Sequence, residues 1–252
     1  MNDAASGPFL SVIIPAFDEE ARIGSALEKL TRHLSGKPYE WEIIVADDGS
    51  TDRTREIVEN AAASDPRIRY LGLRHGGKGW AIKNGMLHST AEWRFMCDAD
   101  LSMPAEHIDR FLPGDQAPDH DIGIGSREAA GSQRFSEPLW RHITGRLYNY
   151  VARLFALGGL NDTQCGFKLY RGSLADRVFE LQTGEGWGFD VEVLYLSRKM
   201  GASIVEIPID WHFSAESKMG FLSGGIAFLD ILAVRWNDIR GRYKGANRSG
   251  QK

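Results

Sequence analysis

Short apolar runs rich in β-branched residues alternate with segments of helical apolar spacing along the first half of the chain. This alternation is the pattern of parallel strands joined by crossover helices. It predicts an α/β fold with a mostly parallel central sheet flanked by helices. The expected strands lie at 10–15, 42–46, 67–71, 93–97 and 120–125. The expected helices lie at 19–34, 50–62 and 79–88.

The second half of the chain has weaker periodicity. Because no internal repeat or low-complexity linker separates the halves, we predict one domain over residues 8–243 and a basic polar tail at 244–252. The elements expected in the second half are helices at 138–156, 190–200 and from about 222, and strands at 166–170 and 203–209.

A polar cluster follows each of the first five predicted strands. In open α/β sheets, ligands bind beyond the carboxyl ends of the strands, so these clusters are expected to meet at one site. In chain order they are Asp18 with Glu19, Asp47 with Asp48, His75 to Gly79, Asp98 with Asp100, and Arg127.

The pair Asp98-Ala-Asp100 places two carboxylates directly after a buried strand, where they can hold a divalent cation, Mg²⁺ or Mn²⁺, against a diphosphate. The spacing alone is not specific, since Asp119-His-Asp121 repeats it. That second pair lies before its strand in a polar loop, so we assign the cation to Asp98 and Asp100.

Residues 72–79 nearly match a phosphate-binding loop, but Gly79 replaces the Ser or Thr that binds magnesium in nucleotide triphosphatases. The glycines and Lys78 still allow backbone N–H groups to approach a phosphate at a helix start, so nucleotide diphosphate binding remains possible. The alternative is a flexible glycine loop. The first strand lacks a following GxGxxG, which disfavours a dinucleotide oxidoreductase.

Composition excludes a globally basic nucleic-acid binder, because 30 Lys and Arg are outnumbered by 34 Asp and Glu, for a net charge of −4. Segments 134–171 and 235–252 are nevertheless basic, and aromatic residues lie among their arginines. Such segments can lie in a membrane interface; the alternative is a solvated helix face. The uncharged stretch at 4–17 is too short to span a bilayer, so we expect a cytoplasmic protein held peripherally on the cytoplasmic face of a membrane.

Four motifs in order resemble the family 2 glycosyltransferases of the GT-A fold. They are Val12-Ile-Ile-Pro15-Ala-Phe17-Asp-Glu19, Asp47-Asp48-Gly49-Ser50-Thr51-Asp52, Gly77-Lys78-Gly79 and Asp98-Ala-Asp100. Three more resemble the dolichyl-phosphate glucose synthase branch, and the similarity covers about residues 10–243. They are Asp162-Thr-Gln-Cys-Gly-Phe-Lys168, Trp187-Gly-Phe-Asp190-Val-Glu192 and Glu216-Ser217-Lys218-Met219.

This resemblance implies a Rossmann-like GT-A domain with a nucleotide-sugar half at about 8–128 and an acceptor half at about 129–243. It implies a nucleotide-sugar donor, a polyprenyl phosphate acceptor and the membrane surface as partners, with no nucleic acid. The donor-binding residues are then Pro15, Ala16, Phe17, Glu19, Asp47, Asp48, Lys78 and Asp98. The metal ligands are Asp98 and Asp100, and the acceptor phosphate lies against Arg127, Arg141 and Lys218.

Three departures from the related mannose synthases favour a UDP-sugar, in particular UDP-glucose, over GDP-mannose. Ser102, Gly145 and His212 stand where the mannose synthases have glutamine, serine and arginine. The glucose synthases also carry an N-terminal membrane anchor, and the ten residues before this fold are too few for one. Membrane contact is therefore expected from the two basic segments.

We expect an inverting, metal-dependent transfer of a hexose, in particular glucose from UDP-glucose, to a polyprenyl or dolichyl monophosphate at the cytoplasmic face of a membrane. Asp98, Asp100, Arg127 and Asp190 are the expected catalytic residues. A phosphate acceptor is already mostly dianionic at neutral pH and needs no general base. A sugar hydroxyl acceptor, the alternative, requires a carboxylate base, for which Asp190 is the best candidate. Asp190 can equally cap the helix that follows it. A non-catalytic nucleotide-sugar or membrane-binding module is the third reading.

Overall fold

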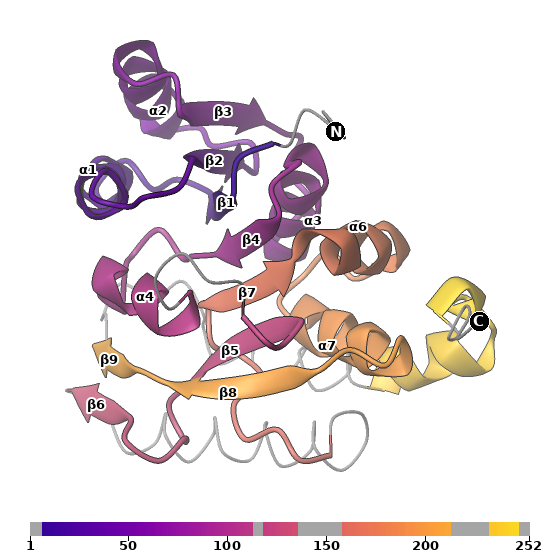
Figure 1. Ribbon diagram of the computed structural model, residues 1–252. Coiled ribbons are helices and arrows are strands. Elements are labelled where there is room, and N and C mark those ends of the chain that lie inside the picture. The colour runs from indigo at the N-terminus through magenta and orange to yellow at the C-terminus, as the bar shows by residue number, and fades with distance from the viewer. Residues whose placement is uncertain (1–6, 113–117, 136–157, 213–231, 247–252) are drawn as a thin grey trace, which may run out of the picture.

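The computed structural model describes residues 7–112, 118–135, 158–212 and 232–246. Seven strands form its central sheet (Figure 1). They are β1 (Leu10–Ala16), β2 (Trp41–Asp47), β3 (Ile68–Gly72), β4 (Trp93–Met96), β5 (Ile122–Ser126), β7 (Lys168–Arg171) and β8 (Ile204–Pro208). Their order across the sheet is β3-β2-β1-β4-β7-β5-β8. All neighbouring strands pair in parallel except β7, which runs antiparallel to β4 and β5. The mostly parallel α/β sheet predicted from the sequence is thus confirmed.

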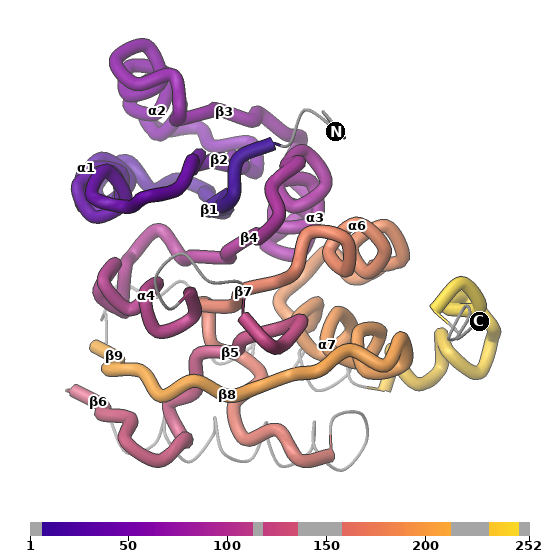
Figure 2. The backbone as a smooth tube through the Cα atoms, viewed as in Figure 1, coloured from indigo at the N-terminus to yellow at the C-terminus, as the bar shows by residue number. Residues whose placement is uncertain are grey.

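Helices cover both faces of this sheet, as the ribbon and tube views show (Figures 1 and 2). They are α1 (Ile23–Leu34), α2 (Thr54–Ser64), α3 (Lys78–His88), α4 (Ile108–Phe111), α6 (Gly172–Leu181) and α7 (Phe189–Lys199), with short 3₁₀ helices η1 (Ala105–His107) and η2 (Lys244–Ala246). Residues 232–239 are also helical and lie beside α7. A second, two-stranded parallel sheet pairs β6 (Gln133–Phe135) with β9 (Asp210–His212).

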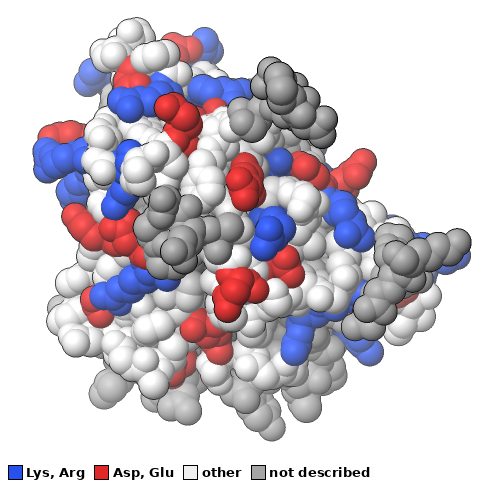
Figure 3. Space-filling model, in the orientation of Figure 1, with Lys and Arg blue, Asp and Glu red and all other residues white. Residues whose placement is uncertain are grey.

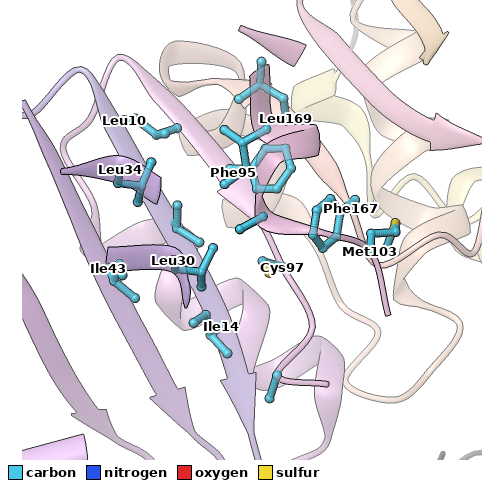
Figure 4. Packing of buried hydrophobic residues seen from close by; sticks show 14 of the residues in the cluster. Leu10, Ile14, Leu30, Leu34, Ile43, Phe95, Cys97, Met103, Phe167 and Leu169 are labelled. Atoms are coloured by element: carbon cyan, nitrogen blue, oxygen red, sulfur yellow. The ribbon is translucent and has the colours of Figure 1, made fainter. Parts of the chain in front are cut away.

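The side-chain alternation of β1 divides the core into two layers. Val12 and Ile14 pack in the layer that includes Leu30 of α1, whereas Ile13 packs in the layer that includes Met86 of α3. Figure 4 shows the first layer, in which Leu30 and Leu34 lie against the sheet. Each such buried aliphatic side chain contributes about 1.5–3 kcal/mol relative to exposure. The burial fixes the sheet and therefore the carboxyl ends of its strands.

Two predicted helices begin later than the sequence pattern indicated. We expected helices from 19 and from 50, but α1 begins at Ile23 and α2 at Thr54. The polar residues before them join the two loops instead: the Thr51 N–H donates to Asp18 Oδ1 (2.8 Å), and the Glu20 N–H donates to Asp52 Oδ2 (3.0 Å). Residues typical of helix starts are used here to hold the β1 and β2 loops together.

In the second half, α6 was not predicted, and the expected helix at 138–156 lies outside the described residues. The antiparallel direction of β7 was not predicted either. It brings Lys168, at the start of β7, level with Met96 at the end of β4 and with Ile124 of β5. The beginning of β7 therefore lies at the same sheet edge as the carboxyl ends of its parallel neighbours.

No helix within the described parts of the chain is long and apolar enough to cross a bilayer.

Candidate active site

The loops after β1 and β2 form the first wall of the site. Asp47 is buried, and its carboxylate accepts hydrogen bonds from the Ser50 N–H (3.0 Å) and the Tyr70 hydroxyl (2.7 Å). The ring of Phe17 lies against His75, with centroids 4.5 Å apart. Pro15 and Ala16 end β1 beside this wall, and Glu19 forms an ion pair with Arg22 (2.6 Å). The expected nucleotide-binding residues are thus gathered at one end of the sheet.

Asp48 organises the glycine loop before α3. Its two carboxylate oxygens accept the N–H groups of Gly76 and Gly77, each at 2.8 Å. The sequence suggested that backbone N–H groups of this loop approach a phosphate; these two bind a carboxylate of the protein instead, because a buried Asp48 requires donors. Gly77 has φ of 105°, a conformation that favours glycine, and α3 starts directly after it.

Lys78, the first residue of α3, reaches the carboxylate pair that follows β4. Its Nζ lies 2.7 Å from Asp98 Oδ1 and 5.2 Å from the centre of the Trp187 ring. Burial lowers the pKa of this ammonium, but the nearby Asp98, Asp190 and Asp100 outweigh that effect and raise it. Lys78 therefore stays protonated beside Asp98, and a protonated lysine is the form that binds a phosphate group.

Asp98 and Asp100 lie on a tight loop that exposes their oxygen atoms. The side chain of Asp98 is 29% exposed, and Asp100 Oδ1 accepts the Ser102 N–H at 2.9 Å. Leu101, which follows Asp100, has φ of 43°, which marks the sharp turn. Carboxylate oxygens suit Mg²⁺ and Mn²⁺, so the donor set fits the expected cation. No cluster of three or more His, Cys, Asp or Glu able to hold a metal occurs within the described ranges, so this pair would need at least one further ligand.

Gly166 leaves the space that Asp98 occupies. A Cβ on Gly166 would lie 2.0 Å from Asp98 Oδ2, too close for any side chain without displacement. The residue before β7 is thus fitted to the first carboxylate of the pair.

The second Asp-x-Asp pair has a structural role, as expected from its position before a strand. Asp121 accepts hydrogen bonds from the Ser203 N–H (2.9 Å) and from Arg171 (3.1 Å). Asp119 is fully exposed.

Asp190 lies in the first turn of α7 and is buried against Lys168. The Lys168 Nζ lies 2.5 Å from Asp190 Oδ1 and also donates to the Cys165 carbonyl at 2.6 Å. Burial raises the pKa of Asp190 above its ordinary value, and the opposing effect of Lys168 and Lys78 reduces that rise without cancelling it. The capping alternative is wrong: Gly188 precedes the helix at the N-cap position, and no side chain caps it.

Arg127, directly after β5, is held by the buried carboxylate of Asp162. Its guanidinium donates twice, from Nε to Asp162 Oδ2 (2.6 Å) and from Nη2 to Oδ1 (2.8 Å). Burial raises the pKa of Asp162, but the charge and hydrogen bonds of Arg127 outweigh it and lower that pKa to about 2. The side chain of Arg127 is 18% exposed, so part of it faces solvent in a fixed orientation.

The remaining acceptor residues, Arg141 and Lys218, lie outside the described residues. Within the described part of the basic segment 134–171, Lys168 is buried, Arg134 pairs with Glu128 (2.5 Å) and Arg171 pairs with Asp121 (3.1 Å). This portion is therefore not the solvated or membrane-facing basic surface that the charge count suggested.

Glu192 connects Tyr243, near the end of the described chain, to residues 183–184 in the loop between α6 and α7. Its buried carboxylate accepts from the Gly184 N–H (2.6 Å), the Thr183 hydroxyl (2.6 Å) and the Tyr243 hydroxyl (2.6 Å). The same loop accepts the Trp80 N–H at the carbonyl of Glu185 (3.1 Å). We use "donor loop" for residues 182–188.

The sequence predicted no individual role for five residues of the site, although all five lie in the motifs that resemble the glucose synthase branch. They are Lys168, Asp162, Gly166, Trp187 and Glu192. Lys168 had a usable signal, because a lysine within the apolar run Phe167 to Tyr170 breaks the pattern of a buried strand and needs a buried partner. The partner itself, 22 residues later, has no local signal.

The fold and this arrangement define a glycosyltransferase of the GT-A class. The family model for Glycosyl transferase family 2 matches residues 11–179. The chain belongs to glycosyl transferase family 2 and is a glycosyltransferase.

Relatives support this over most of the chain. The dolichyl-phosphate beta-glucosyltransferase of Dictyostelium discoideum is 33% identical over 250 residues, covering 94% of this chain and 76% of the relative. The protein of the same name from Homo sapiens is 28% identical, covering 93% and 77%.

Solved structures show the same fold. One is glucosyl-3-phosphoglycerate synthase of Mycobacterium tuberculosis in complex with Mn²⁺, UDP and glucosyl-3-phosphoglycerate, with a TM-score of 0.67 and 16% identity. The similarity covers 98% of this chain and 83% of that one.

Proposed function

We propose that this glycosyltransferase transfers glucose from UDP-glucose to a polyprenyl monophosphate such as dolichyl phosphate, with inversion at the anomeric carbon. Curated relatives at 28–34% identity carry the name dolichyl-phosphate beta-glucosyltransferase, which supports both the sugar and the acceptor. The solved complexes of similar fold contain UDP or UDP-glucose with Mn²⁺, which is in line with a UDP-sugar donor and a divalent cation.

The observation that carries the acceptor class is the buried pair of Lys168 and Asp190. A hydroxyl acceptor requires a base near the reacting atoms, and Asp190 is the carboxylate placed best for that task. Its Oδ1 is bound by Lys168 at 2.5 Å, and the residue is 4% exposed. A phosphate monoester, with a second pKa near 6, needs no proton removed at neutral pH. The site therefore favours an acceptor that is already ionised at neutral pH and needs no base to become a nucleophile.

On the donor side, Lys78 is placed to hold the diphosphate, and Asp98 and Asp100 are the residues that would hold the cation. A bound divalent cation would neutralise the charge that develops on the leaving diphosphate. Lys78 adds a fixed positive charge in a partly buried setting, where electrostatic stabilisation is stronger than in water. Leaving-group stabilisation is the main catalytic contribution of these residues.

Of the three predicted acceptor-binding residues, Arg127 is the one that lies within the described part of the chain. Its guanidinium donates two hydrogen bonds to Asp162, so that its orientation is fixed before substrate arrives. We assign it, with Arg141 and Lys218, to positioning the acceptor phosphate for in-line attack. In this proposal residues 8–243 act as a single domain, in which residues 8–128 supply most of the donor-binding residues. Residues 129–243 supply acceptor-binding residues and also residues that support the donor site, such as Gly166 and Asp190.

We place the enzyme on the cytoplasmic face of a membrane, in contact through residues 232–240. Leu232, Trp236 and Ile239 are 52%, 54% and 76% exposed, and their spacing puts them on one helix face. Arg240 lies over the Trp236 ring at 4.7 Å, and Arg235 is also exposed. An apolar face with tryptophan and arginine suits an interface containing anionic lipid.

The test is transfer of radiolabel from UDP-glucose, GDP-mannose or UDP-N-acetylglucosamine to polyprenyl phosphate, with Mg²⁺ or Mn²⁺, followed by organic extraction. We expect lipid-phase label from UDP-glucose alone. Asp100→Asn should lower turnover at least a hundredfold, whereas Asp119→Asn, in the second Asp-x-Asp pair, should leave it unchanged.

Label from another donor alone would overturn the sugar assignment. Release of nucleotide without lipid label would overturn the acceptor and indicate a hydroxyl acceptor. Nucleotide-sugar binding without turnover of any donor would indicate a non-catalytic module.

A further inference from the structure

Lys168 is a fully buried charge in the middle of the central sheet, and the proposed reaction does not use it directly. It lies on β7, paired in register with Met96 of β4 and Ile124 of β5. Burying an ammonium group costs several kcal/mol unless an opposite charge lies against it. An apolar residue would fill this position at lower cost, so stability alone does not account for a lysine here.

The opposite charge is Asp190, and Asp190 leads on to the donor site. Lys168 Nζ lies 2.5 Å from Asp190 Oδ1, and a second hydrogen bond to the Cys165 carbonyl (2.6 Å) fixes the ammonium in place. Asp190 and Lys78 are each next in sequence to one of two residues in close contact, since a Cβ on Gly79 would lie 2.8 Å from the Cβ of Phe189. At this short range Asp190 helps to raise the pKa of Lys78. The Lys78 Nζ in turn lies 2.7 Å from Asp98 Oδ1. Positive and negative charges thus alternate from the sheet to the site, in the order Lys168, Asp190, Lys78, Asp98.

We propose that Lys168 is a positioning residue of the donor site, which holds Asp190 as a fixed counter-charge beside Lys78 and so keeps the Lys78 ammonium in place for the diphosphate. Asp98 cannot fill this role alone, because it is also an expected cation ligand. Asp190 is bound on its other side by a buried lysine and remains beside Lys78 when Asp98 has another partner. The proposal rests on donor binding by Lys78, as described above.

The test is the affinity for UDP in the presence of Mn²⁺, measured by titration calorimetry, which does not depend on turnover or on the acceptor. Lys168→Met alone leaves a buried, unpaired carboxylate and can fail to fold. The decisive variant is therefore Lys168→Met/Asp190→Asn, which replaces the pair by neutral side chains of similar size. We expect its thermal midpoint to stay near that of the wild type, because neutral replacement of a buried ion pair is often tolerated. Its dissociation constant for UDP should rise about tenfold.

A second background separates positioning from a merely structural role. In Lys78→Met, the same pair substitution should change the dissociation constant less than twofold, because there is no ammonium left to position. An equal loss of affinity in both backgrounds would overturn the proposal. So would unchanged UDP affinity in the folded double variant, or failure of the double variant to fold, since the pair would then serve folding alone.

Lys37→Met/Asp109→Asn is the matched control. It removes another Lys–Asp pair, with Nζ and Oδ1 2.6 Å apart, which joins the end of α1 to α4 and takes no part in the site. It should bind UDP as the wild type does. Absence of UDP binding by the wild type itself would contradict the proposed function, whereas wild-type affinity in the double variant contradicts only the role of Lys168.

Discussion

Gly166 and Asp98 illustrate how single residues shape the donor site. The space occupied by Asp98 Oδ2 is the space that a side chain on Gly166 would need, because a Cβ there would lie 2.0 Å from this oxygen. The carboxylate is thereby confined on the side opposite its ion pair with Lys78, in which Oδ1 lies 2.7 Å from Nζ. Similarly, Asp48 holds two backbone N–H groups and so fixes the loop in front of Lys78. In both cases a neighbouring residue fixes the position of a group in the donor site.

Gly166→Ala should displace Asp98 and weaken cation-dependent UDP binding at least tenfold. The effect on folding should be smaller, because the clash is with the end of a side chain that is 29% exposed. Calorimetric titration of UDP with Mn²⁺ measures the change. Gly36→Ala is the control, since Gly36 lies outside the site and a Cβ there would meet only the His33 carbonyl oxygen, at 3.7 Å. Equal affinities of the two variants would contradict the fitted role of Gly166.

Ionisation of Asp162 should make the free energy of unfolding depend on pH. Its pKa is about 2 in the folded protein against an ordinary value of 3.8, so its ionised form stabilises the fold above pH 4. That contribution, about 2 kcal/mol, is lost as the pH falls from 4 towards 2. Urea unfolding between pH 6 and pH 2.5 should therefore show a weaker pH dependence in Asp162→Asn than in the wild type. The exposed residue Asp119 gives a control, and Asp119→Asn should keep the wild-type slope.

At the scale of elements, the antiparallel strand β7 changes the composition of the site. In an all-parallel sheet, the residues at the start of a strand lie at the opposite edge from the ligand. Reversal of β7 brings Lys168 to the edge where β4 and β5 end. The segment before β7 then reaches Asp98, and α7 after it supplies Asp190. The sheet therefore contributes charged residues from both strand directions to one place.

The sequence was sufficient for the elements with strong periodicity and for residues that directly follow parallel strands. Asp98, Asp100, Lys78 and Arg127 all lie where the strand ends predict them. It was not sufficient for the direction of β7, because alternation of apolar residues is the same in either direction. The partners of buried charges were also missed, since Lys168 and Asp190 lie on different elements and meet only in the folded chain.

The helix at residues 232–239 should bind lipid through its exposed apolar face. We expect Trp236→Ala/Ile239→Ser to lose at least tenfold in affinity for vesicles containing anionic phospholipid, measured by co-sedimentation. Binding of the wild type should weaken as salt is raised, because arginines contribute to it. Leu87→Ala, at another exposed apolar residue on α3, is the control. Unchanged vesicle binding in the double variant would contradict contact through this face.

At the scale of the whole molecule, the donor site is assembled from distant parts of the chain. Lys78 and Asp98 come from the first half, whereas Gly166 and Asp190 come from the second. The two parts share one sheet, since β7 is inserted between β4 and β5. On the face shown in Figure 3, acidic and basic residues are interspersed rather than segregated, so the overall field does not select the ligand. Recognition depends on the local arrangement at the strand ends.

Because the site joins both parts, donor binding should stabilise the whole fold. UDP with Mn²⁺ at about a hundred times its dissociation constant should stabilise the protein by about 2.7 kcal/mol, which raises the thermal midpoint by several degrees. Chelation of Mn²⁺ with EDTA should reverse most of the shift. An equal shift by UDP in the presence of EDTA would show that the cation takes no part in donor binding.

The hydrogen bond between Tyr243 and Glu192 has a consequence for regulation. Tyr243 follows residues 232–240, which we place against lipid, and the bond ties this part of the chain to the donor loop through a carboxylate that accepts from both. Thermodynamic linkage is reciprocal. If contact with the bilayer favours the arrangement of the donor loop that binds UDP-glucose, then occupancy of the donor site must favour residence on the bilayer by the same factor. The enzyme would then stay longest on the membrane when UDP-glucose occupies the donor site and the lipid acceptor can bind.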